Sequence, residues 1–306
     1  MSRPKYSRLV IPRRAREDWI SGLISLYAPL GLAEEGRDLV ACFRNPDPAR
    51  QALAEAPDWG QRPLRVGVCE PGGFSRQDDV ADQGQLLPMP NNMSYEDGAA
   101  FTMTYGTSYY ALKQRSDYKP GETLLVTGAS GGVGLTAVEL GALMGLKVIA
   151  AVGSDEKMEV CRKYGATMFV NYAKEKMRDK VKELTGGNGA DIIYDAVGGD
   201  AFDESIRCIA WYGRLLVVGF AAGRIPQLPA NLALLKSCDV RGVFYGAWRA
   251  REPDEARKNF DELLAWYGKG KLKPHISMRF PLEKGAEAMN ALLSRKATGK
   301  VVLTVA

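Results

Sequence analysis

The chain has 306 residues, and its 41 basic and 36 acidic residues give a formal net charge of +5. So balanced a charge argues against a dedicated nucleic-acid-binding protein, which would carry a clustered basic stripe. The longest apolar stretches are far shorter than the roughly 18–20 residues that span a bilayer. We therefore expect a globular protein whose partners include neither a nucleic acid nor a membrane.

The chain contains one histidine, His275, and five cysteines, at positions 42, 69, 161, 208 and 238. The cysteines form no Cys-x-x-Cys pair, and a catalytic zinc would have to combine His275 with scattered cysteines or carboxylates. A hydrolase triad would depend on the same histidine. The sequence therefore predicts no metal site. Widely spaced cysteines indicate free thiols in a reducing compartment, so we expect a cytoplasmic protein, with a mitochondrial location as the alternative.

Residues 1–83 differ in composition from the rest of the chain. Residues 1–80 contain 11 Arg and one Lys, whereas residues 81–306 contain 12 Arg and 17 Lys. The arginine-rich opening and the apolar stretch at 19–33 resemble a targeting leader, but Glu17 and Asp18 between them argue against one. The best helical pattern lies at 49–56, and Pro and Gly interrupt the remainder.

From residue 119 onward, predicted strands alternate with predicted helices. Residues 123–127 form a short apolar, β-branched run, which is typical of a buried strand, and the stretch GASGGVG at 128–134 leads into a helical pattern at 135–144. Further strands are predicted at 147–152, 168–170, 191–195, 213–219 and 239–245, and further helices at 155–164, 174–184 and 200–209. This alternation predicts an α/β fold with a doubly wound parallel sheet.

The glycine-rich stretch indicates a nucleotide site. Between a strand and a helix, glycines let the backbone approach a pyrophosphate, and the helix N-terminus stabilises its charge. An NAD site usually has an acidic residue at the end of the second strand, where this chain has Gly153 and Ser154. Ser154 and Lys157 could bind a 2′-phosphate instead, which favours NADPH. The alternative is that Asp155 caps the next helix and Lys157 is merely solvated.

Residues 127–134 also fit the Thr-Gly-x-x-x-Gly-x-Gly pattern of short-chain dehydrogenases. Tyr267 and Lys271 have the Tyr-x-x-x-Lys spacing of that family, in which the lysine lowers the pKa of the catalytic tyrosine. Here Gly268 and Gly270 lie within the spacing and weaken a helix. We therefore interpret Tyr267 as the last turn of a surface helix and keep ketone reduction of this type as an alternative.

Several short stretches of residues 83–306 occur in the same order in one known family. They are LLPMP (86–90), TYGTSYYAL (104–112), KPGE (119–122), GASGGVG (128–134), YDAVGG (194–199), GRLLVVGF (213–220), IP (225–226), PANL (229–232) and TGKVV (298–302). On these stretches the chain resembles the zinc-free medium-chain dehydrogenases/reductases of the quinone oxidoreductase type, which include zeta-crystallin.

The resemblance implies two domains. One is the doubly wound, NADP-binding Rossmann domain, at residues 105–250. The other is a GroES-like, β-rich catalytic domain, of which 84–104 and 251–306 would be the remainder. Residues 1–83 are too short for the missing part and carry none of its motifs, so we expect this domain to be truncated or degraded. The abrupt change near residue 83 suggests, as a hypothesis, translation in another reading frame.

The resemblance also implies an activity, the transfer of a hydride from NADPH to a quinone or an α,β-unsaturated carbonyl, without zinc. The alternative is a non-catalytic NADPH-binding protein that has lost the wall of its substrate pocket. The family forms homodimers, here through the predicted sixth strand at 239–245. Edge pairing of this kind satisfies exposed backbone groups.

The family's cofactor contacts fall on four groups of residues. Gly131, Gly132 and Val133 would meet the pyrophosphate. Ser154, Lys157 and Tyr172 would bind the adenosine 2′-phosphate. Residues 195–198 would lie along the ribose. The residues near the nicotinamide would be Thr107, Gly219, Phe220, Ala221, Phe244 and Tyr245. Core packing is the alternative for the aromatic residues, and helix capping is the alternative for Thr107.

No catalytic acid is assigned by the resemblance. The proton would come from water or from a cofactor hydroxyl. Tyr105 and Tyr109 are candidates, and packing is the alternative that we favour for both.

Overall fold

The structure is a computed structural model that describes residues 40–42, 66–67 and 87–304. The chain divides into two units, 1–37 and 38–306, and all described residues lie in the second. Most of the atypical segment 1–83, including the apolar stretch at 19–33 and the predicted helix at 49–56, lies outside the described residues. The hypothesis about its reading frame and the expected truncation of a second domain stay untested.

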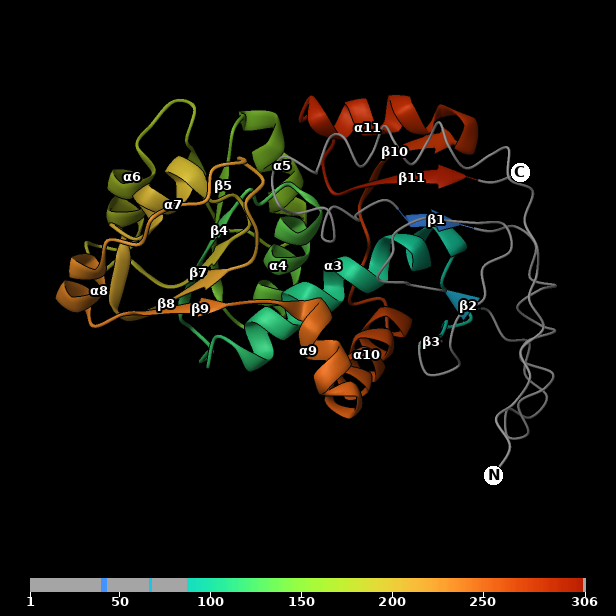
Figure 1. Ribbon diagram of the computed structural model, residues 1–306, viewed down its shortest axis with the longest axis horizontal. Helices are drawn as coiled ribbons and strands as arrows, with labels where there is room; N and C mark the ends of the chain where they lie inside the picture. The colour runs from blue at the N-terminus through green and yellow to red at the C-terminus, as the bar shows by residue number, and fades with distance from the viewer. Residues whose placement is uncertain (1–39, 43–65, 68–86, 305–306) are drawn as a thin grey trace. The chain divides into compact units, whose positions relative to one another are not determined.

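A six-stranded parallel sheet forms the centre of the described chain (Figure 1). Its strands follow the order β6-β5-β4-β7-β8-β9, and every neighbouring pair is parallel. This is the doubly wound Rossmann order, which reverses direction between β4 and β7. The strands are β4 (Thr123–Thr127), β5 (Lys147–Val152), β6 (Met168–Asn171), β7 (Ala190–Asp195), β8 (Ile209–Val217) and β9 (Asp239–Gly242). The predicted α/β fold class is confirmed.

Helices cover both faces of the sheet (Figure 1). Leu124 and Val126 of β4 pack on one face, and Leu125 between them packs on the other, as the twofold period of a strand requires. One face carries α4 (Gly132–Leu143) and α5 (Asp155–Lys163), and the other carries α6 (Met177–Leu184) and α7 (Gly199–Ser205). Burial on both faces explains why β4 and β5 are continuous apolar runs rather than alternating ones.

A long helix, α3 (Tyr95–Gln114), packs against α4 on the same face. Ser94 caps it, since its side chain accepts a hydrogen bond from the Asp97 amide at 3.0 Å. Most of its residues are buried, because α10 (Pro253–Gly268) covers it from the other side. Two short helices precede α10, namely α8 (Ala230–Lys236) and α9 (Tyr245–Arg251).

The C-terminal part returns to the glycine-rich stretch through a small second sheet of order β1-β11-β10. β1 (Val40–Cys42) and β10 (Ile276–Pro281) both pair in parallel with β11 (Lys300–Thr304). A 3-10 turn (Leu282–Lys284) and α11 (Gly285–Leu293) connect β10 to β11. β2 (Val66–Gly67) and β3 (Leu87–Pro88) form a separate antiparallel pair.

The bounds of two predicted strands are wrong. The strand expected at 213–219 is β8, which runs from Ile209 to Val217 and so begins within the helix expected at 200–209. The sixth strand was expected to run to Tyr245, but β9 ends at Gly242, and Phe244 is the N-cap of α9. Tyr245 is the first residue of that helix and packs against Tyr110 and Trp248. Aromatic residues favour strands locally, but here tertiary packing decides.

A partly buried ion pair joins β8 to the chain just before β4. Arg214 Nη2 lies 2.6 Å from Glu122 Oε2, Arg214 Nη1 lies 3.1 Å from Glu122 Oε1, and Arg214 Nε donates to the Ser116 carbonyl oxygen at 2.7 Å. The two charged side chains are 12% and 19% exposed. Removal of either one would leave its partner poorly solvated.

We expect Arg214→Ala to lower the free energy of unfolding by about 2–3 kcal/mol, because it leaves the Glu122 carboxylate half-buried and unpaired. Chemical denaturation measures the change. Lys258→Ala is the matched control, since Lys258 pairs with Glu255 at an exposed site, and its cost should stay below about 0.5 kcal/mol. Equal costs for the two variants would contradict this account of the ion pair.

Candidate nucleotide site

The turn between β4 and α4 is too tight for any side chain at Gly134. A Cβ atom at this position would lie 2.2 Å from the carbonyl oxygen of Gly128, well inside van der Waals contact. Gly128 itself has φ +60°, and its carbonyl oxygen accepts a hydrogen bond from the Gly131 amide at 2.9 Å. This close packing brings the first turn of α4 directly onto the carboxyl end of β4.

Gly131, Gly132 and Val133 therefore lie at the N-terminus of α4, as expected for residues that meet a pyrophosphate. Gly131 is the N-cap, and no side chain caps the helix there. The amides of the first helical turn lack partners within a helix, so they can donate to an anion. The residues present fit a dinucleotide on this ground, although their contact with one stays a prediction.

A buried carboxylate fixes the neighbouring loop where the strand order reverses. Asp195, at the end of β7, is fully buried and accepts a hydrogen bond from Thr127 Oγ1 at 2.5 Å. It also accepts from the amides of Val197 and Gly198. Burial raises the pKa of Asp195, and these donors partly offset the rise. The contacts hold residues 195–198, which are expected along the ribose, beside the end of β4.

Ser154, Lys157 and Tyr172 lie at the carboxyl ends of the neighbouring strands β5 and β6. Ser154 is the N-cap of α5, Lys157 lies in its first turn, and Tyr172 follows β6. The Tyr172 ring lies against Gly153, where an added Cβ atom would be 3.3 Å from it. The structure thus brings together the three residues predicted to bind the adenosine 2′-phosphate.

Arg295 joins this group, and sequence reasoning missed it. The Arg295 carbonyl oxygen accepts a hydrogen bond from Lys157 Nζ at 3.0 Å. Burial raises the pKa of Tyr172, and the positive charge of Arg295 partly offsets the rise. The Arg295 guanidinium is therefore close enough to Tyr172 to affect its ionisation. Arg295 is 138 positions from Lys157, and no local pattern in the sequence indicates this proximity.

The two acidic residues at the start of α5 are both engaged. Asp155 pairs with Lys174 at 2.5 Å and accepts a hydrogen bond from Asn171 Nδ2 at 2.7 Å. The alternative in which Asp155 caps α5 is therefore wrong, and Lys157 is not merely solvated. A hydrogen bond from the Ser154 side chain lowers the pKa of Glu156.

The residues expected near the nicotinamide fall into two groups. Gly219, Phe220 and Ala221 follow β8 at its carboxyl end, and Phe220 packs against Gly198. Phe244 is 61% exposed beside the end of β9. Tyr245, in contrast, is buried against Gly106 of α3. This favours packing for Tyr245, whereas the group that follows β8 borders the proposed site.

Three further candidate residues, all with a side-chain hydroxyl group, lie on α3. Thr107 lies in the middle of the helix, with its Oγ1 3.9 Å from Met103 Sδ, so it is not a helix cap. Tyr105 and Tyr109 are buried and donate hydrogen bonds to Glu139 and Glu262. Burial and these carboxylates raise the pKa of both tyrosines, which favours packing over proton donation.

Lys300 is a second residue that sequence reasoning missed. It is buried, and its Cδ lies 3.2 Å from the position of a Cβ added to Gly132. The chain around it is bound to the glycine-rich stretch, because the Gly299 amide donates to the Ser130 carbonyl oxygen at 2.7 Å. A basic residue near the C-terminus thus lies against the first turn of α4.

The described residues offer neither a cluster of metal ligands nor a membrane-spanning helix. In residues 40–42, 66–67 and 87–304, no group of three or more His, Cys, Asp or Glu residues is placed to hold a metal ion. Within the same described residues, no helix is long and apolar enough to cross a membrane. His275 Nε2 lies 3.0 Å from Thr298 Oγ1.

Comparisons with known proteins agree with this architecture. A sequence model of the family described as zinc-binding dehydrogenase matches residues 132–266. The quinone oxidoreductase of Pseudomonas aeruginosa is 31% identical over 278 residues, which cover 90% of this chain and 82% of that protein. The chain belongs to the quinone oxidoreductase family. Its resemblance to this branch of the medium-chain dehydrogenases/reductases is thereby confirmed.

Two more members of the quinone oxidoreductase family define the extent of the match. A quinone oxidoreductase-like protein 2 homolog from Nematostella vectensis is 44% identical over 240 residues, 78% of this chain. The chain matches 66% of that relative's length. The structure of Escherichia coli quinone oxidoreductase complexed with NADPH superposes with a TM-score of 0.68 at 28% identity, over 72% of this chain and 68% of that one.

Membership of this family removes the short-chain alternative. Tyr267 lies in the last turn of α10, as predicted, and its hydroxyl donates to Asp97 Oδ2 at 2.7 Å. The helix ends at Gly268, and Gly270 has φ +69°. Tyr267 and Lys271 therefore do not share a helix face, as the two glycines between them suggest.

We expect Gly134→Ala to destabilise the protein by about 1–3 kcal/mol, because the new methyl group has to displace the Gly128 carbonyl group. Thermal unfolding without ligand measures the effect. Gly268→Ala is the matched control, since an added Cβ atom there meets nothing within 4 Å. A Gly134→Ala protein as stable as the Gly268→Ala protein would contradict the tight packing of this turn.

Proposed function

We propose that the protein is a reductase that binds NADPH along the carboxyl edge of its six-stranded sheet. The observation that carries the proposal is the arrangement at this edge. An uncapped α4 N-terminus follows β4, and the group around Lys157, Tyr172 and Arg295 lies at the ends of the next two strands, β5 and β6. A pyrophosphate fits the first feature and a 2′-phosphate fits the second. Solved family members in complex with NADPH, from E. coli and a mycobacterium, support this choice.

The acceptor that we propose is a quinone or an α,β-unsaturated carbonyl compound. When bound, NADPH supplies the hydride from C4 of its nicotinamide. The chain's own contribution is positioning, in which Gly219, Phe220 and Ala221 border the nicotinamide and the Asp195 contacts hold the ribose loop. We propose that the proton comes from water or a cofactor hydroxyl, because raised pKa values make Tyr105 and Tyr109 poor donors.

A homodimer completes the proposal. β9 is the last strand of the six-stranded sheet, so its outer backbone groups have no neighbour within that sheet. Pairing with β9 of a second copy would satisfy them. Size measurement by light scattering tests this part independently of the activity.

Lys157→Ala should raise the Kd for NADPH about tenfold, which corresponds to the loss of one charge-assisted hydrogen bond. The Kd for NADH, which lacks the 2′-phosphate, should not change. Titration calorimetry measures both values. Lys163→Ala in the same helix is the matched control and should leave both unchanged. If Lys157→Ala leaves the preference for NADPH over NADH intact, the assignment of the phosphate site is wrong.

Turnover is tested with a panel of quinones and enones, by following the loss of reduced nicotinamide absorbance. We expect oxidation of NADPH with at least one acceptor, and slower oxidation of NADH. Tight binding of NADPH without turnover on any acceptor would select the alternative, a non-catalytic NADPH-binding protein. Failure to bind either nucleotide would reject both.

A further inference from the structure

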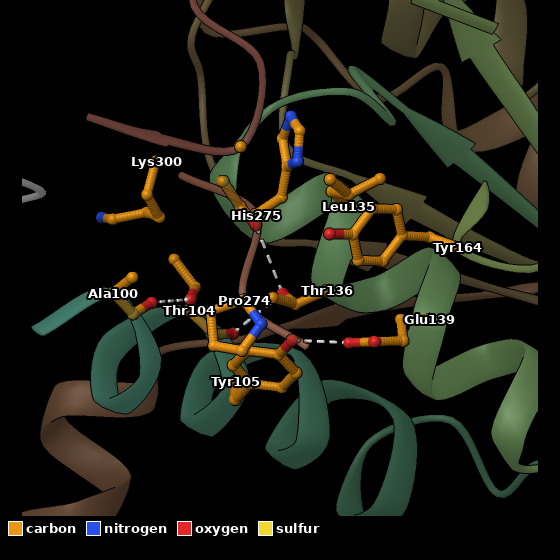
Figure 2. A pocket seen from close by; sticks show the side chains of 12 residues that line it. Ala100, Thr104, Tyr105, Leu135, Thr136, Glu139, Tyr164, Pro274, His275 and Lys300 are labelled. Atoms are coloured by element: carbon orange, nitrogen blue, oxygen red, sulfur yellow. Dashed lines mark hydrogen bonds between the residues drawn. The ribbon is translucent and has the colours of Figure 1, made fainter. Parts of the chain in front are cut away.

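A second polar cluster lies behind the glycine-rich stretch, between α3, α4 and the chain that leads into β10 (Figure 2). It borders a cavity of about 10 Å³, which holds about one water molecule. Tyr105, Glu139, Tyr164 and His275 line this cavity. Apart from the weak candidate Tyr105, none of these side chains has a role in the proposed reaction.

Glu139 is the centre of this cluster. Its Oε2 accepts a hydrogen bond from Tyr105 Oη at 2.5 Å, and Figure 2 shows the two side chains directed toward each other. Its Oε1 accepts from the backbone amide of Lys273 at 2.9 Å. One carboxylate on α4 thus holds both α3 and the segment before β10.

This segment is connected to the nucleotide site by further hydrogen bonds. Two residues after Lys273, the carbonyl oxygen of His275 accepts from the Lys300 amide at 2.7 Å. The neighbouring Gly299 amide donates to Ser130 within the glycine-rich stretch, also at 2.7 Å. Hydrogen bonds thus connect the segment of Lys273 and His275 to Gly299 and Lys300, which lie against the N-terminus of α4.

We propose that Glu139 is a positioning residue for the nucleotide site: through Lys273 and His275 it holds Gly299 and Lys300 against the pyrophosphate-binding turn, and it holds them more firmly when ionised. The part that concerns nucleotide affinity rests on the proposed function. The part that concerns the hold on Lys273 does not.

The electrostatic surroundings give this hold a pH dependence. Burial raises the pKa of Glu139 to about 7, and the hydrogen bonds from Tyr105 and Lys273 limit the rise. An ionised carboxylate accepts on both oxygens with charge assistance, whereas the neutral form carries a proton on one of them. The hold on the Lys273 amide is therefore stronger above pH 7 than below it.

The other titratable groups around the cluster are Tyr105, Tyr164, His275, Asp97 and Lys300. Burial raises the pKa of Tyr105, and burial and Glu139 raise that of Tyr164 to about 12, so both tyrosines stay neutral near pH 7. Burial and Lys163 lower the pKa of His275, which moves it away from 7. Glu139 is the group of the cluster whose pKa is shifted to about 7.

The first test follows the amide proton of Lys273 by NMR in the protein without nucleotide. We expect its chemical shift to titrate with a midpoint near pH 7, because its acceptor changes charge. Glu139→Gln, which mimics the neutral carboxyl group, should abolish this titration. Tyr105→Phe removes a donor that lowers the pKa of Glu139, so the midpoint should rise; this variant also keeps the test valid if Glu139→Gln fails to fold.

Glu262→Gln is the matched control. Glu262 accepts hydrogen bonds from Tyr109 and Lys113 but does not contact the segment before β10. The chemical shift of the Lys273 amide proton should depend on pH in this variant as it does in the wild type. A Lys273 amide that does not titrate between pH 6 and pH 8, or that titrates unchanged in Glu139→Gln, would overturn the proposal.

The second test measures the ratio of the Kd for NADPH of Glu139→Gln to that of the wild type at each pH. Ionisation of the 2′-phosphate affects both proteins equally and therefore does not change this ratio. We expect the ratio to be near 1 at pH 6, where wild-type Glu139 is mostly neutral, and about 3 to 10 at pH 8. The positioning role would be overturned by a ratio that does not change with pH while the chemical shift of the Lys273 amide does. If this chemical shift changes with pH but no nucleotide binds, the proposed function is wrong, and the pH-dependent hydrogen bond from Lys273 to Glu139 is still supported.

Thermal stability should depend on pH in the opposite direction to the hydrogen bond from Lys273, which becomes stronger as the pH rises. The pKa of Glu139 is raised on folding, so ionisation disfavours the folded state: its contribution to stability is present at low pH and is lost as the pH rises through 7. We expect Glu139→Gln to have a higher Tm than the wild type at pH 8, and the two Tm values to converge below pH 4.5, the ordinary pKa of a glutamate. A lower Tm at pH 8 would contradict the raised pKa on which the proposal depends.

Discussion

The contact between Gly134 and the carbonyl group of Gly128 is the constraint on which the rest of the site depends. It lets α4 start immediately after β4, with its N-terminal amides at the carboxyl edge of the sheet. The neighbouring strand β7 ends in Asp195, whose buried carboxylate joins Thr127 of β4 to the amides of Val197 and Gly198. The turn proposed to bind the pyrophosphate and the loop held by Asp195 thus lie side by side where the strand order reverses, which is where open α/β sheets bind ligands.

The C-terminal part of the chain completes this edge. Gly299 pairs with the glycine-rich stretch, Lys300 covers Gly132, and Arg295 lies at Lys157 and Tyr172. The segment that closes on the nucleotide site is therefore held from α4 itself, through Glu139. In the proposed arrangement, α4 and the chain that lies against its N-terminus are joined through Glu139, and the charge of this buried carboxylate makes their geometry depend on pH.

The central strands could be predicted closely from the sequence. β4 and β5 have the predicted bounds, because a strand buried on both faces is a continuous apolar run between polar turns. The predicted helices at 174–184 and 200–209 became the shorter α6 and α7, since propensity alone does not fix helix ends. The end of β9 was wrong, because Tyr245 packs against residues of α3 far away in the sequence. Arg295 and Lys300 could not be found for the same reason: only the folded chain brings Arg295 to Lys157 and Lys300 to Gly132. Glu139 lies in the helix predicted after the glycine-rich stretch, but its partners Tyr105 and Lys273 are far away in the sequence.

The most direct measurement is a crystal structure of the protein with NADPH bound. The account predicts that the pyrophosphate lies against Gly131 to Val133, at the N-terminus of α4, and that the 2′-phosphate lies within hydrogen-bond distance of Lys157 or Arg295. It also predicts that Gly299 and Lys300 remain against α4. A nucleotide bound at any other edge of the sheet, or a 2′-phosphate directed away from both basic side chains, would contradict it.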